Sequence, residues 1–161
     1  MPMTSRERFL NALARKPVDH IPCHEGPWGA TVQRWTNEGH LKKGEDLVKH
    51  FNTDLRTGGW LNSCADLDFK EVILEETEDT ILKLDGNGAK LRRHKKHDST
   101  PEHVDFTVKD RTGWQEHIKR HLLQIDRRRI SFAGYRDTRK LAAKEQRMFC
   151  WAGVAPFEQM H

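Results

Sequence analysis

The segment from residue 70 to residue 96 constrains the fold of this chain more than any other. Apolar and charged residues alternate over 82–85 and again over 89–92, and the sequence Asp-Gly-Asn-Gly at 85–88 joins the two runs. A period of two residues is typical of half-buried strands, and a glycine-rich link between two such runs predicts a β-hairpin. The apolar residues inside the acidic segment 71–76 add a third strand. We therefore expect an antiparallel β-meander over about residues 70–96.

The hairpin register follows from the loop that is chosen. If Asn87–Gly88 forms a two-residue loop, both residues can adopt positive φ at low cost, Leu84 faces Leu91, and Asp85 faces Lys90. A register one residue tighter would lose that ion pair. We therefore expect the two-residue loop.

The bulk composition excludes several classes of protein. With 161 residues the chain is long enough for one domain with its own core, although 32% of its residues are charged. No apolar run approaches the roughly 20 residues of a membrane span, and the N-terminus has no apolar signal core. Cys23, Cys64 and Cys150 are far apart and odd in number, which favours reduced thiols. We expect a cytoplasmic protein without a membrane partner.

The net charge of +4 does not indicate a nucleic-acid partner. The basic residues concentrate at 90–96 and at 127–129, and no aromatic residues interleave with them as a base-stacking surface would need. Solvated strand and loop surface is the interpretation that we favour.

Helices are expected on both sides of the meander. Thr4 and Glu7 have the spacing of a capping box, and the apolar stripe that follows ends before Pro17. Asp110 is placed to cap a later helix. Further helices are predicted at about 31–37, 45–51 and 135–146.

A continuous apolar run at 148–155 is typical of a parallel strand buried on both faces. Such a strand needs neighbours on both sides and a crossover connection. We therefore expect residues 1–161 to form a single domain that is the N-terminal portion of a longer protein.

Three segments carry a resemblance to a known family. Residues 3–13 read MTSRERFLNAL and are followed by KPVDHIP at 16–22. Together they look like the opening helix and loop of the uroporphyrinogen decarboxylase superfamily, which includes cobalamin-linked methyltransferases. Residues 51–55 resemble the segment leading into the first barrel strand of that family, and 153–157 resemble a glycine, alanine or serine, proline, aromatic signature after a later strand.

The resemblance implies a fold class. Members of the superfamily are (β/α)₈ barrels, which need roughly 250 residues. We therefore expect an α/β protein that forms the N-terminal part of a (β/α)₈ TIM-type barrel, with lead-in helices and the meander at about 70–96 inserted near the active-site face. A full-length parent would be an enzyme, and these 161 residues alone would be inactive.

Departures from the family pattern bear on the chemistry. Decarboxylases carry an arginine-rich segment after the opening loop, whereas Cys23–Trp28 contains none and the next arginine is Arg34. Their strand aspartate also has no carboxylate counterpart in Gly59–Cys64, where Asn62 lies. The methyltransferase-like or uncharacterised branch is therefore our first prediction, and a porphyrinogen carboxy-lyase is the second. The third is a small non-enzymatic binding protein that uses the basic meander face.

Four residues are candidates for a substrate cleft, and no catalytic residue is assigned. Glu158 and His161 lie in the loop after the strand that contains Trp151, which opens onto the barrel mouth in the family. Asn62 lies after the expected first strand. The partner implied by this cleft is a small-molecule substrate.

Two pairs of histidines lie three or four residues apart in the sequence, a spacing at which both could reach one metal ion. His117 and His121 are four residues apart but lack an HExxH pattern, so we expect a helix-edge pair. His94 and His97 lie at a basic strand end, where cations would repel a metal ion. No cofactor or metal is expected within this chain. For the full-length parent, the resemblance implies zinc, a corrinoid methyl donor, a corrinoid protein as partner, and a homodimer.

Overall fold

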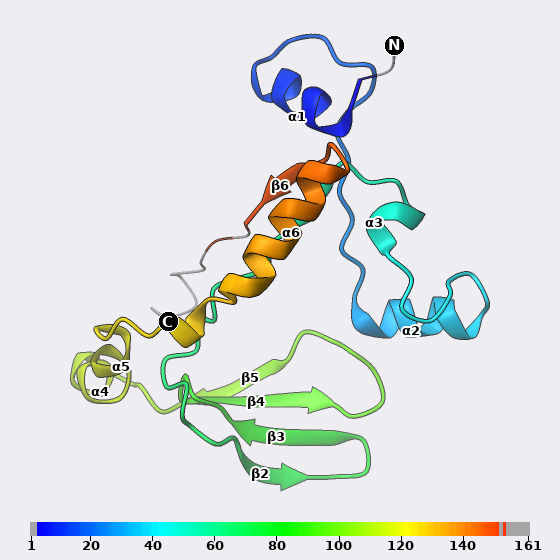
Figure 1. Ribbon diagram of the computed structural model, residues 1–161. Coiled ribbons are helices and arrows are strands. Elements are labelled where there is room, and N and C mark those ends of the chain that lie inside the picture. The colour runs from blue at the N-terminus through cyan, green and yellow to red at the C-terminus, as the bar shows by residue number, and fades with distance from the viewer. Residues whose placement is uncertain (1–2, 152, 154–161) are drawn as a thin grey trace. The chain divides into compact units, whose positions relative to one another are not determined.

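The computed structural model describes residues 3–151 and residue 153, which divide into two compact units. Unit 1 comprises the described residues up to Leu61 together with those from Ile130 onward, and unit 2 comprises residues 62–129. Each unit contains its own β-sheet (Figure 1). The single cooperative domain expected from the sequence stays a prediction.

Unit 1 combines a two-stranded parallel sheet with helices. Its described elements are α1 (Ser5–Leu13), α2 (Gly29–Asn37), α3 (Leu47–His50), β1 (Leu55–Thr57), α6 (Phe132–Lys144) and β6 (Met148–Cys150). Strands β1 and β6 are parallel, with Arg56 beside Phe149 and Thr57 beside Cys150.

The capping box at the start of α1 is confirmed. The Thr4 hydroxyl oxygen accepts from the Glu7 amide at 3.2 Å, and the Glu7 carboxylate accepts from the Thr4 amide at 2.9 Å. The helix ends at Leu13, short of Pro17, because Arg15 adopts a positive φ of 56°.

Helix α6 covers one face of the parallel sheet. The Phe149 ring lies edge-on to the Tyr135 ring of α6 at 5.1 Å, and Ala142 on the same helix is fully buried. Gly58 permits this packing, because a Cβ there would lie 2.8 Å from the Phe149 ring. The predicted parallel strand is confirmed over residues 148–150. It is not buried on both faces there, because Cys150 is exposed.

Unit 2 is built around a four-stranded antiparallel sheet in the order β2-β3-β4-β5 (Figure 1). Its elements are β2 (Val72–Glu76), β3 (Thr80–Leu84), β4 (Ala89–His94), β5 (Glu102–Phe106), α4 (Arg111–Trp114), the π-helical η1 (Gln115–Lys119), α5 (Arg120–Leu122) and the 3₁₀ turn η2 (Arg127–Arg129). The predicted meander is confirmed and extended by β5. Asp110 caps α4 as expected, accepting from the Gly113 amide at 2.8 Å.

The predicted hairpin register is wrong by one residue. Leu84 pairs with Lys90 rather than Leu91, so the loop has three residues, Gly86–Gly88. The cause is local: the Asp85 carboxylate accepts from the amides of Asn87 and Ala89, both at 2.9 Å, and Gly88 alone takes a positive φ, of 74°. A loop whose last residue is a left-handed glycine is the usual three-residue hairpin solution.

The structure is mixed α/β with one parallel and one antiparallel sheet, and the described residues form no closed barrel. The predicted (β/α)₈ barrel portion is not confirmed and stays a proposal. Within the described residues, no helix is long and apolar enough to cross a membrane.

The most buried side chains are often charged. The buried apolar residues of the described chain are few and mostly small, and the buried polar residues are Arg8, Thr53, Asp54 and Arg56, all in unit 1. Ion pairs therefore take a large part in holding unit 1 together.

Candidate functional site

The predicted cleft of Asn62, Trp151, Glu158 and His161 stays a prediction. Glu158 and His161 lie outside the described residues. Asn62 is an exposed residue of unit 2 whose side chain accepts from the Cys64 amide at 3.0 Å, which is a local turn contact. Trp151 belongs to unit 1, is half-buried, and lies edge-on to Tyr135 at 6.5 Å.

The carboxyl edge of the parallel sheet is the better candidate for a substrate site in unit 1. Thr57 and Cys150 end the two strands side by side, and both are exposed. Because side chains alternate along a strand, these two lie on the face opposite Phe149, away from α6. Ligands of parallel α/β sheets bind outside the carboxyl ends of the strands.

Backbone bonds fix the path of the chain beyond this edge. The Gly58 amide donates to the Cys150 carbonyl at 2.8 Å, and the Leu61 amide donates to the Gly153 carbonyl at 3.1 Å. The Cys150 thiol itself donates to the Trp151 carbonyl at 3.4 Å. The sequence reasoning missed Thr57 and Cys150, although the two-residue period of Met148–Cys150 could have placed the thiol opposite Phe149.

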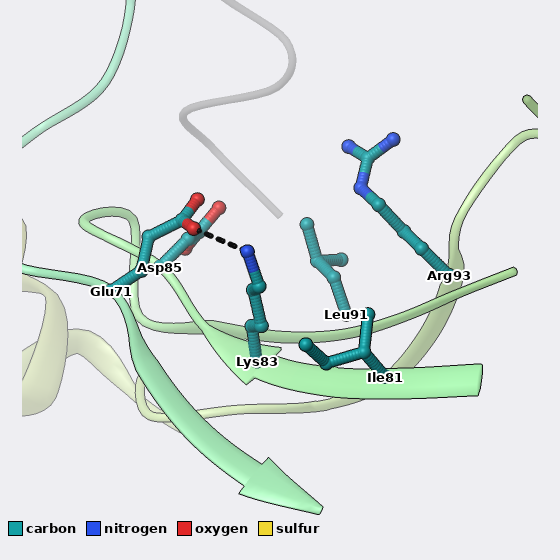
Figure 2. A pocket seen from close by; sticks show the side chains of 6 residues that line it. All are labelled: Glu71, Ile81, Lys83, Asp85, Leu91 and Arg93. Carbon is teal, nitrogen blue, oxygen red and sulfur yellow. Dashed lines mark hydrogen bonds and ion pairs between the residues drawn. The ribbon is translucent and has the colours of Figure 1, made fainter. Parts of the chain in front are cut away.

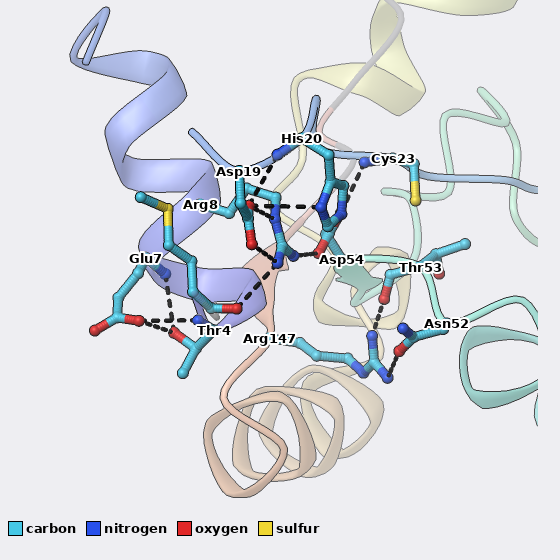
Figure 3. Close-up of polar contacts among 11 residues, drawn as sticks. Thr4, Glu7, Arg8, Asp19, His20, Cys23, Asn52, Thr53, Asp54 and Arg147 are labelled. Atoms are coloured by element: carbon cyan, nitrogen blue, oxygen red, sulfur yellow. Dashed lines mark hydrogen bonds and ion pairs between the residues drawn. The ribbon is translucent and has the colours of Figure 1, made fainter. Parts of the chain in front are cut away.

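An ionic centre holds α1 to the start of β1 (Figure 3). The Arg8 guanidinium donates to both oxygens of Asp19, at 2.6 and 2.9 Å, and to Asp54 Oδ1 at 2.5 Å. The second Asp54 oxygen accepts from the Cys23 amide at 2.9 Å. The His20 ring lies at the rim, with Nδ1 3.5 Å from Asp19 and Nε2 4.0 Å from Asp54.

The electrostatics of this centre indicate a structural role. The hydrogen bond from Arg8 holds the pKa of the Asp19 carboxyl well below its ordinary value. Burial alone would raise the pKa of Asp54, but hydrogen bonds led by that from the Cys23 amide outweigh burial and lower it. Both carboxylates therefore stay ionised and engaged, which makes them poor general acids or bases.

A second ionic centre, around Arg56 within β1, also anchors this strand. The Arg56 guanidinium, only 8% exposed as a residue, donates to Glu145 at 2.5 and 3.0 Å and to Asp46 at 2.6 and 3.2 Å. Asp46 also caps α3 by accepting from the Val48 amide at 3.1 Å. Between them, the two centres fix β1 against α1, α3 and the end of α6.

Unit 2 carries a small hollow on one face of its sheet (Figure 2). It has a volume of about 80 Å³ and is lined by Glu71, Ile81, Lys83, Asp85, Leu91 and Arg93. Ile81 and Leu91 form an apolar floor, and Lys83 donates to Glu71 at 2.9 Å. Arg93 stands beside this floor (Figure 2). Among the described residues the neighbouring strand cations Lys83, Lys90 and Arg92 form ion pairs, whereas Arg93 has none.

An arginine clamp shapes the start of unit 2. The Arg129 guanidinium donates to the backbone carbonyls of Asn62, Cys64 and Ala65, two of these bonds measuring 3.1 and 2.9 Å. From the other side, the Asn87 side chain accepts from the Ala65 amide at 2.7 Å. The loop is thereby held between η2 and the β3–β4 turn.

The zinc ion that the resemblance implies would need several His, Cys, Asp or Glu side chains close together. No group of three or more His, Cys, Asp or Glu side chains in the described part of the chain could share a metal ion. The described residues therefore contain no ligand set for the zinc of the expected parent enzyme.

No family model, no curated protein and no solved structure matches this chain.

Proposed function

We propose that unit 1 is the opening segment of a (β/α)₈ barrel enzyme related to the uroporphyrinogen decarboxylase superfamily, with its small-molecule site at the carboxyl edge of β1 and β6. The observation that carries the proposal is the parallel β1–β6 pair, which α6 covers on the Phe149 face, while the described residues leave Thr57 and Cys150 exposed. Parallel sheets are normally covered on both faces. The face that carries Thr57 and Cys150 would be the barrel interior, which is where such enzymes place their reacting groups at strand ends.

The described arginines favour the methyltransferase-like or uncharacterised branch over decarboxylation of a porphyrinogen. A polycarboxylate substrate needs free cations, and guanidinium groups are the usual choice. Arg8 and Arg56 are each occupied by two carboxylates. The parent enzyme would draw zinc, its corrinoid donor, its corrinoid-protein partner and any second copy from outside these residues.

The test begins with the natural polypeptide. Antibodies raised against the 161-residue chain should detect a protein much larger than its 18.8 kDa in the source cells. The purified natural protein should transfer a methyl group from methylcobalamin to a thiol acceptor and lack porphyrinogen decarboxylase activity. Cys150→Ser should lower the methyl-transfer rate, while Cys23→Ser, a change to another exposed thiol, should not. If the natural polypeptide has a mass of only 18.8 kDa and unfolds cooperatively on heating, the proposal is wrong.

Anion binding by the meander is a second candidate, favoured by one observation only. Unit 2 has 14 acidic and 14 basic residues, so its field is not that of a nucleic-acid binder. Most of its strand cations are paired, for instance Lys90 with Asp105 at 2.9 Å, but Arg93 has no ion-pair partner within the part of the chain that the structure describes. Its position over an apolar floor suits a short aliphatic carboxylate.

Butyrate is a suitable probe of this second candidate. It should shift the amide resonances of the strands around Arg93 in a saturable titration. Arg93→Gln should abolish the shifts, whereas Lys90→Gln on the opposite face should leave them unchanged. Equal responses of the two variants would remove this candidate.

A further inference from the structure

Two histidines are stacked where β4 ends. The rings of His94 and His97 have centroids 4.2 Å apart and an interplanar angle of 26°. Both residues are exposed, so their ring nitrogens are accessible to solvent ions. The turn that brings them together is fixed by a backbone bond from the Lys95 amide to the Asp79 carbonyl at 2.8 Å.

The cations between the two histidines are neutralised by the neighbouring turn. Lys95 Nζ donates to Glu76 at 2.8 Å and to the Thr77 carbonyl at 3.1 Å. Lys96 Nζ donates to Asp79 at 2.6 Å. Both ammonium groups are thus drawn toward carboxylates of the β2–β3 link. The repulsion expected from the sequence is therefore reduced for these two lysines.

The other histidine pair is engaged elsewhere. His121 Nε2 accepts from Arg120 Nε at 3.1 Å, and its Nδ1 lies 3.9 Å from Asp66. His117 lies within the π-helical turn η1, whose wider winding changes the alignment of residues four apart. No ring contact joins His117 to His121 among the described contacts, so this pair is a matched negative control for His94 and His97.

We propose that His94 and His97 form a surface site for one divalent late transition-metal ion, such as Ni²⁺, Cu²⁺ or Zn²⁺. Imidazole nitrogen is a preferred ligand of these ions. Imidazole lone pairs lie in the ring plane, so the two exposed rings turn out of their stacked arrangement for each to supply one nitrogen, and water fills the remaining positions. Because the described residues supply no third ligand to any metal, the site binds more weakly than a closed structural zinc site.

The site is independent of the barrel proposal, since it uses residues of unit 2 alone. Lys95 and Lys96, which lie between the two histidines, pair with Glu76, Glu78 and Asp79 on the β2–β3 link. Arg93 and Asp98 flank the pair in the sequence. Releasing Lys95 by Glu76→Gln should therefore weaken the site without touching a ligand.

Titration calorimetry of the 161-residue chain with NiCl₂ at pH 7.5 tests the proposal. One equivalent should bind. His97→Ala should weaken binding by about tenfold or more, the loss typical of a damaged metal site. Glu76→Gln should weaken it by a smaller factor. His117→Ala should bind like the unmodified chain.

Histidine side-chain resonances identify the ligands directly. Added Ni²⁺ should broaden the signals of His94 and His97 first, and those of His103 and His121 only in excess. Circular dichroism should show that His97→Ala keeps its fold. Unchanged binding by a folded His97→Ala protein, or loss of binding in His117→Ala, would overturn the proposal.

Discussion

Unit 1 and unit 2 use the same charged residue types in opposite ways. In unit 1 the guanidinium groups of Arg8 and Arg56 are buried, and each is held by two carboxylates. In unit 2 the sheet lysines lie near the surface, as in the Lys90–Asp105 pair, whose side chains are 37% and 36% exposed. Removing one partner of a buried pair leaves the other charge buried and unpaired, whereas water readily solvates the remaining partner of an exposed pair. Stability in this charge-rich chain should therefore depend on a few desolvated groups.

The strongest test of this contrast is Arg8→Met. The variant leaves Asp54, which is 1% exposed, without its buried cation. We expect the free energy of unfolding to fall by about 3–5 kcal/mol. Urea unfolding followed by tryptophan fluorescence measures it, because Trp28, Trp35, Trp60 and Trp151 all lie in unit 1. A loss below about 1 kcal/mol, the size of an exposed pair, would contradict the contrast.

The acid unfolding of the two units should differ in how strongly it depends on salt. The pKa values of Asp19, Asp54 and Asp46 are lowered in the folded state, so the native protein binds fewer protons than the unfolded chain. Their contribution is present above the ordinary carboxylate range of about 4 and is lost as the pH falls below it.

Added salt should weaken the exposed pairs of unit 2 far more than the buried ionic centres of unit 1. In a Trp114→Phe background, fluorescence reports unit 1 alone. The midpoint of its acid transition should move little between low and high salt. A large salt-dependent shift of that midpoint would mean that the ionic centres are effectively solvated.

Gly86→Ala tests a packing constraint in unit 2 that carries no charge. A Cβ at this position would lie 2.5 Å from the Asp66 carbonyl oxygen and 2.6 Å from Cys64 Sγ. Overpacking of this kind costs about 1–3 kcal/mol. The melting temperature from circular dichroism should fall, while Gly26→Ala, which meets nothing within 4 Å, should leave it unchanged. Identical melting of the two variants would count against the close packing at Gly86.

Lys90→Met should have the smallest effect. Asp105 keeps a second partner in Lys109, so no carboxylate is left unpaired. The expected change in the free energy of unfolding is below about 1 kcal/mol, measured by urea unfolding followed by circular dichroism. If this exposed substitution cost as much as Arg8→Met, the two units would not differ as described.

Local signals predicted much of the fold. The Thr4–Glu7 capping box, the Asp110 cap and the alternation in β3 and β4 each act within a few residues, and the structure contains all three. The hairpin register was missed because the Asp85 carboxylate captures two loop amides, a competition that the alternation of Leu82 and Leu84 cannot reveal. Strand β5 is short and mixed in polarity, and it had no signal of its own.

The candidate site was less predictable because its supports are distant in sequence. Arg8 and Asp54 are 46 positions apart, and Arg56 and Glu145 are 89 apart. Nothing in the sequence around Arg8 distinguishes it from Arg6, the exposed arginine of α1. Thr57 and Cys150 become neighbours only through the pairing of β1 with β6.

The Arg129 clamp has a consequence for how this sequence can vary. Its guanidinium holds backbone carbonyls, which every amino acid provides, so the clamp itself does not require particular side chains at the residues whose carbonyls it binds. In diverged copies of the gene we expect these loop residues to vary more than residue 129, which should stay arginine because lysine lacks the fixed fork of donors. Because an arginine from outside the loop binds it through backbone atoms, the sequence of the loop can change during evolution while its path is kept.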